Sequence, residues 1–112
     1  MESNTSLWPL SDRLHLWSLA TARSHALFPH FLSHYAAHGV HLATRAHVVV
    51  HEDFAPPATL RRAALALRSV RDVRWQPSVN SSALEGLKLQ GLNDFIAKEL
   101  PAAAWLAVFD TS

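Results

Sequence analysis

Apolar and polar residues form four short strand-like patterns along the chain, and a helical pattern separates each from the next. Residues 14–20 alternate between two sets of bulky side chains, and residues 45–51 form a β-branched run typical of a buried strand. Residues 70–75 form a short segment ended by Pro77, and residues 104–109 form an apolar segment that ends on Asp110. We expect each of these four segments to form a β-strand.

Between the strands, apolar residues recur at the three- and four-residue spacing of an amphipathic helix. The predicted helices span residues 28–38, 58–68 and 82–99. Pro29 suits the first turn of the first helix, and Gly39 suits the position just after its end. Ser82 and Glu85 have the spacing of a capping box, which predicts that they cap the third helix.

The resulting order, β-α-β-α-β-α-β, predicts an α/β fold with a parallel sheet, right-handed crossovers and a partial Rossmann-like topology. Residues 1–12 are polar and are interpreted as a leader, with one domain over residues 13–112. A last strand ending at Asp110 would leave backbone groups unpaired, so this edge could pair with another chain.

Composition narrows the classes of protein to consider. The chain is 49% hydrophobic and 17% charged, as in globular proteins, and its net charge of +1 implies no field for nucleic-acid binding. It has no cysteine, which excludes disulfides and thiolate metal sites. No apolar run reaches the roughly 18 to 20 residues of a membrane span, and the first residues lack a signal-peptide pattern.

Three of the eight histidines, His30, His34 and His38, are spaced to lie along one face of a helix. Two imidazoles four residues apart can chelate a metal, but the neighbouring glutamate of zinc proteases is missing, and a further ligand would have to come from His41 or His51. A stripe that responds to pH is a second possibility. We interpret the stripe as the polar outer face of the helix.

Acidic residues follow two of the predicted strands: Glu52 and Asp53 the second, and Asp110 the fourth. Ligands of open parallel sheets bind outside the carboxyl ends of the strands, where a carboxylate can hold a ribose hydroxyl, a base edge or a divalent cation. The alternative is that these residues only cap strands and turns. The chain has neither a phosphate-binding glycine loop nor a serine nucleophile motif.

Three blocks taken together suggest a family. They read "LFPHFLSHYAAHGV" (27–40), "AHVVVHED" (46–53) and "LKLQGLNDFIAKELPAAAWLAVFD" (87–110). Their order resembles inverting glycosyltransferases of the GT-A fold, from the family two-like and family ninety-two-like groups. Members typically show a helix reading L-P-E-F-L-x-H-H-x-x-x-G-V, a strand that ends in an acid, and a later D-x-D-E-F metal motif. The resemblance covers most of residues 14–112.

The resemblance implies roles for particular residues. Asp110 matches the first Asp of the D-x-D motif, which coordinates a divalent metal (Mn or Mg) on the diphosphate, whereas Ser112 stands in place of the second. Asp53, next to Glu52, matches the acid on the side where the family holds uridine or its ribose. His34 matches a helix histidine that packs or positions.

Lys88 and Asn93, on the helix before the metal strand, are further candidates for nucleotide binding under the resemblance. Residues 23–25 read Arg-Ser-His where many members carry Asn-Glu. The resemblance therefore predicts an incomplete glycosyltransferase-like domain that binds a UDP- or GDP-sugar and transfers glycosyl groups only in a complete protein. The alternative is a non-catalytic α/β module that pairs through its exposed sheet edge.

Overall fold

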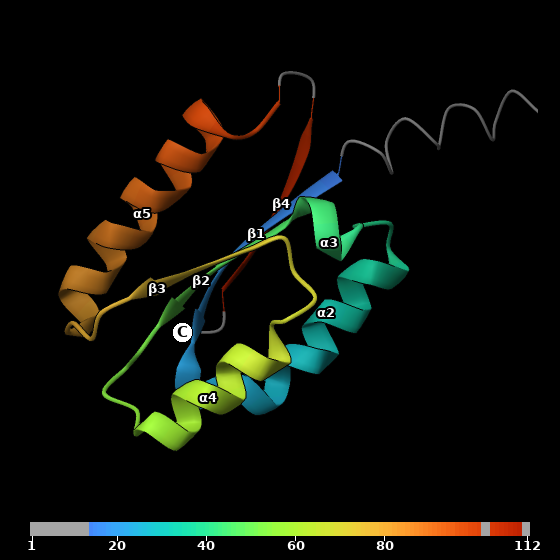
Figure 1. The fold of residues 1–112 in the computed structure, drawn as a ribbon. Coiled ribbons are helices and arrows are strands. Elements are labelled where there is room, and N and C mark those ends of the chain that lie inside the picture. Colours follow the sequence, from blue (N-terminus) through green and yellow to red (C-terminus); the bar gives the residue numbers. More distant parts are fainter. Residues whose placement is uncertain (1–13, 102–103, 111–112) are drawn as a thin grey trace, which may run out of the picture.

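The chain forms three layers, a central sheet with helices on both faces (Figure 1). The structure, a computed structural model, describes residues 14–101 and 104–110, without the side chains of residues 109 and 110, so the polar segment 1–12 lies outside it. The elements are β1 (Leu14–Thr21), η1 (Ala22–Leu27), α2 (Phe28–Ala37), α3 (Leu42–Arg45), β2 (Ala46–His51), α4 (Pro57–Ala66), β3 (Asp72–Gln76), α5 (Ser81–Lys98) and β4 (Trp105–Asp110). The predicted α/β class and strand–helix alternation are confirmed.

The four strands are all parallel and lie in the order β3-β2-β1-β4. The chain moves outward from β1 to β3, and α5 then returns it to the far side of β1, which is compatible with a Rossmann-like fold. Because β1 is covered on both faces, Leu16, Trp17 and Leu19 are all buried in spite of their alternation. This topology brings the carboxyl ends of all four strands to one edge.

Helices α2 and α4 cover one face of the sheet, and α5 alone covers the other (Figure 1). On the first face the largest fully buried apolar side chains are Leu16, Phe28, Val48, Val50 and Leu67. On the second face Leu84 and Phe95 of α5 pack against Trp17 and Leu19. Burial of each such side chain stabilises the fold by about 2 kcal/mol, so the two cores hold the layers together.

The start of α5 differs from the prediction. The helix begins at Ser81, and its cap is Asn80, whose side-chain oxygen accepts a 2.8 Å hydrogen bond from the backbone N–H of Ala83. The capping box expected at Ser82 and Glu85 is therefore wrong, because the helix starts before Ser82 and a cap must precede the first turn. Further along α5, the ring of Trp17 packs beside Gly91, where an added Cβ atom would lie 3.5 Å from it.

The first crossover and the outer face of α5 differ from the prediction. The first crossover holds a 3₁₀ segment, Ala22–Leu27, and a short helix, Leu42–Arg45, that the apolar pattern did not indicate. Gly39 ends α2 with a φ of 103°, which confirms its expected role, because a left-handed residue there is least costly as glycine. Leu87 and Ile96 of α5 stay exposed, because only one stripe of this helix reaches the sheet.

In the described part of the chain, no helix combines the length and the apolar character that crossing a membrane requires.

Candidate functional site

The loop after β2 carries the acidic pair that the sequence singled out. The backbone N–H of Glu52 donates to the carbonyl of Gln76 at the end of β3, and the carbonyl of Glu52 accepts from Ala55, which closes a turn. Inside this turn Asp53 and Phe54 both have a φ of 54°. Two consecutive left-handed residues other than glycine are unusual, and such strained backbone gathers at functional sites.

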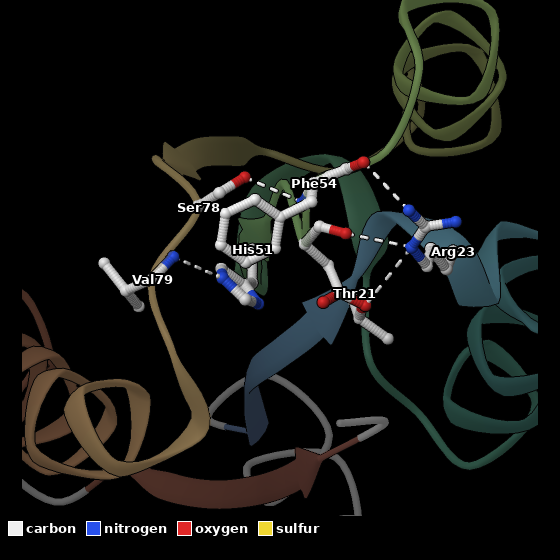
Figure 2. A network of polar contacts seen from close by, with 7 residues as sticks. Thr21, Arg23, His51, Phe54, Ser78 and Val79 are labelled. Carbon is white, nitrogen blue, oxygen red and sulfur yellow. Dashed lines mark hydrogen bonds and ion pairs between the residues drawn. The ribbon is translucent and has the colours of Figure 1, made fainter.

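Asp53 is held by two residues from the end of β1 and the segment after it. The hydroxyl of Thr21 donates a 2.8 Å hydrogen bond to Oδ2 of Asp53. Arg23 donates from Nε to the carbonyl of Asp53 and from Nη2 to the carbonyl of Phe54, and its Nε lies 3.8 Å from Oδ2 of Asp53 (Figure 2). The carboxylate thus has a defined direction while 38% of the Asp53 side chain remains exposed.

The loop after β3 joins the same network. The hydroxyl of Ser78 accepts a 2.8 Å hydrogen bond from the backbone N–H of Phe54, and Nε2 of His51 accepts one of 3.0 Å from the N–H of Val79 (Figure 2). His51 is 3% exposed, and acceptance at Nε2 requires that the proton of the neutral ring be on Nδ1. Loops after three adjacent strands are therefore bonded to one another.

These loops and the start of α5 surround a hollow of about 350 Å³. Thr21, His51, Asp53 and Phe54 line one side, and Asn80 and the first turn of α5 line the other. The unpaired N–H groups of a helix start carry a partial positive charge, which favours negatively charged groups nearby. The hollow thus combines a fixed carboxylate, an exposed aromatic ring and a helix start at the carboxyl edge of the sheet.

The acids predicted to share this edge lie after β2 and at the end of β4. Glu52 and Asp53 follow the end of β2, and the carboxylate of Asp53 turns toward β1. Asp110 is the last residue of β4, and its backbone pairs with Leu19, so it reaches the same edge on the other side of β1. The side chain of Asp110 lies outside the described residues.

Lys88 and Asn93 are not brought to this edge. With a rise of about 1.5 Å per residue, they lie roughly 10 Å and 18 Å along α5 from its start at Ser81. Lys88 lines a separate hollow of about 270 Å³ between α5 and the sheet, and Asn93 is exposed. The polar groups of the hollow at the carboxyl edge come instead from the ends of the strands, the loops after them and the start of α5.

The histidine stripe forms the outer face of α2, as interpreted from the sequence. His30, His34 and His38 are all exposed, and Nδ1 of His38 lies 2.8 Å from the carbonyl of His34. Among the residues that the structure describes, no three His, Cys, Asp or Glu side chains are grouped so that they could hold a metal ion. This part of the chain does not supply a complete ligand set for a divalent cation.

A different pair of histidines, the buried His47 and the partly buried His15, lies at the opposite, amino-terminal edge of the sheet. His15 and His47 stack with ring centroids 6.1 Å apart, and the His47 ring also lies 4.5 Å from that of Phe95. Burial lowers the pKa of His47, although the carboxylate of Asp72 opposes this effect. Burial also lowers the pKa of His15, with a further contribution from His47 itself. In both rings burial favours the neutral form.

Sequence reasoning identified Asp53 but missed the residues that orient it. Thr21 lies one residue beyond the predicted strand 14–20, and a polar residue at the end of an apolar strand is the signal that indicates it. Arg23 differs from the family pattern, and Phe54 and Ser78 carry no local signal.

Comparisons with known proteins identified no matching family model and no significantly similar curated protein or solved structure.

Proposed function

We propose that the hollow at the carboxyl edge binds the nucleotide part of a UDP- or GDP-sugar, and that the chain is a glycosyltransferase-like domain of the GT-A type. The observation that carries this proposal is the fixed, partly exposed carboxylate of Asp53 after the second strand of a parallel sheet. In sheets of this kind, ligands bind beyond the carboxyl ends of the strands. The order of the three sequence blocks from Leu27 to Asp110 adds independent support.

Asp53 can recognise a nucleoside by accepting hydrogen bonds. A carboxylate accepts up to about four hydrogen bonds, so Asp53 keeps capacity for a ribose hydroxyl or a base N–H after it has accepted from Thr21. The guanidinium of Arg23 offsets part of its negative charge, which lowers the repulsion of a nearby diphosphate. The partial positive charge at the start of α5, across the hollow, favours phosphate oxygens.

The resemblance also implies a magnesium or manganese ion bound by Asp110, which would neutralise the leaving diphosphate. The described side chains do not complete such a site. The metal therefore rests on the resemblance alone, and nucleotide recognition by Asp53 does not depend on it.

Saturation-transfer NMR with UDP and GDP in magnesium buffer tests the proposal on the full chain. We expect weak binding by the wild type and a several-fold lower signal for Asp53→Asn. Asparagine tolerates a left-handed φ, so this change removes the charge without adding strain to the turn. Asp94→Asn is the matched control, because Asp94 is an exposed acid of α5 that lines the other hollow.

Two outcomes would contradict the proposal: no signal from either nucleotide with the wild type, or equal signals from wild type and Asp53→Asn. A reduced signal for Asp110→Asn in magnesium, but not in buffer with a chelator, is expected if Asp110 binds the metal.

An interaction module is a second candidate, because one exposed strand edge favours it. Within the described residues β4 pairs only with β1, and its Trp105 and Val108 are 59% and 46% exposed. An edge strand with free backbone groups and exposed apolar side chains invites the addition of a further strand. This function would use β4, whereas nucleotide binding would use the carboxyl edge, so the two can be tested separately.

A further inference from the structure

Phe54 presents a large aromatic ring at the rim of the hollow. Phe54 is 67% exposed, the highest value among the exposed large apolar residues that the structure describes, and it lines the hollow together with Asp53 and His51. Burial in the core therefore does not explain why position 54 is aromatic, because most of the surface of Phe54 remains in water. A single exposed apolar residue needs no explanation in general, but the backbone of this one is unusually constrained.

Three hydrogen bonds fix the backbone on which the Phe54 ring is mounted. Its N–H donates to the Ser78 hydroxyl at 2.8 Å, its carbonyl accepts from Arg23 at 2.8 Å, and the preceding carbonyl of Asp53 accepts from Arg23 at 2.9 Å. Figure 2 shows the ring of Phe54 between Ser78 and Val79 on one side and Thr21 and Arg23 on the other. The ring is thus exposed while the backbone that carries it is anchored to two other loops.

The local conformation is costly for phenylalanine. A φ of 54° is unfavourable for a residue with a bulky side chain, and glycine or asparagine would adopt it with less strain. The hydrogen bonds to Ser78 and Arg23 use only backbone atoms of Phe54, so they would survive replacement of its side chain. Neither the core nor the turn requires an aromatic residue here, which leaves a ligand as the partner of the ring.

We infer that Phe54 is the platform on which the nucleobase of the bound nucleotide stacks, with Asp53 contacting the adjacent ribose or base edge. This inference rests on the proposed function, since it assigns a role within the same hollow. An aromatic face attracts the face of any base, so Phe54 contributes affinity for both uracil and guanine and does not select between them. A ring on an anchored backbone also loses little conformational freedom when the base binds.

The test measures binding of UDP, GDP and inorganic diphosphate to the full chain by ligand-detected NMR. We expect Phe54→Gly to weaken both nucleotides about tenfold, as for the loss of one base–aromatic stack, and to leave inorganic diphosphate unchanged. Phe54→Trp is expected to keep or increase nucleotide affinity. In the wild type, the uracil H5 and H6 protons should receive most of the saturation.

The variants are chosen so that misfolding cannot imitate the expected result. Phe54→Gly relieves the left-handed strain and keeps the backbone hydrogen bonds, so its thermal midpoint should not fall. Leu65→Ala is the matched control, because Leu65 is an exposed apolar residue of α4 at 62%, and its truncation should leave nucleotide binding unchanged.

The outcomes separate this inference from the proposed function. If the wild type binds UDP and Phe54→Gly binds it equally well, the stacking role is overturned and nucleotide binding stands. If the wild type binds neither nucleotide, both are overturned. If Phe54→Gly weakens diphosphate as much as UDP, the ring acts on the shape of the loop and not on the base, and the stacking role is again overturned.

Discussion

Thr21 and Asp53 are 32 positions apart in the chain, yet the hydroxyl of Thr21 donates a 2.8 Å hydrogen bond to the carboxylate of Asp53. Thr21 is the last residue of β1, and Asp53 lies in the loop after the neighbouring strand β2. The contact sets the direction of the carboxylate on which nucleotide recognition is proposed to depend, and it links the stability of the fold to the geometry of the site.

Replacement of Thr21 by valine should therefore lower the stability of the fold and the affinity for UDP. Valine keeps the shape of threonine but cannot donate, so the carboxylate loses a partly buried partner. We expect the free energy of unfolding, measured by urea titration, to fall by about 1 to 2 kcal/mol. UDP binding should weaken as well. Thr44→Val is the control, because the Thr44 hydroxyl bonds to His41 on the surface. Equal losses in both variants would contradict the role of Thr21.

Acid should destabilise the protein through His15 and His47. Burial lowers the pKa of His15 and His47 below the usual value of 6.5, so the unfolded chain binds protons more readily than the folded one. Their stabilising effect is complete above about pH 6.5 and is lost as the pH falls from there through the lowered values. The free energy of unfolding can then fall by up to about 1.4 kcal/mol per pH unit for each histidine.

Urea titrations between pH 5 and 7.5 measure this slope. His47→Gln should flatten it, because glutamine does not titrate. His34→Gln, in the exposed stripe on α2, should leave it unchanged. A stability that is constant across this range in the wild type would show that these rings accept protons in the folded state without cost.

Two glycines should respond in opposite ways to alanine. Gly86 lies inside α5, and a Cβ atom there would meet nothing within 4 Å, so Gly86→Ala should raise the free energy of unfolding by about 1 kcal/mol. Gly39 has a φ of 103°, so Gly39→Ala should lower it by about 1 to 2 kcal/mol. Urea titration of the pair checks both signs, and a loss of stability in Gly86→Ala would place an unrecognised contact on that face of the helix.

The edge of β4 should support association of the chain. Sedimentation velocity over a range of concentrations is expected to show a reversible increase in mass, and Val108→Lys should weaken it at least about tenfold, because a charge at an edge strand opposes pairing. Leu65→Lys places the same charge on an exposed apolar site of α4 and should have no effect. A single monomeric species at every concentration would remove the support for an interaction module.

The sequence by itself determined the identity and order of the main elements. The predicted strands and main helices agree with the observed bounds to within about two residues. Apolar spacing is a local property, and it decides which face of a segment can be buried wherever that segment lies in the fold. The alternation of strands and helices then favours a parallel sheet, because a helix between two strands returns the chain to the end of the sheet at which the first strand began.

Only the tertiary structure decided which of the polar residues act together. The β3-β2-β1-β4 order places Thr21 beside the loop of Asp53, and the backbone of Phe54 is bonded to Arg23 and Ser78 from other loops. The same packing leaves Lys88 on the flank of α5, away from that edge. Such contacts join residues more than twenty positions apart, and no local pattern encodes them, because their geometry depends on how all three layers pack.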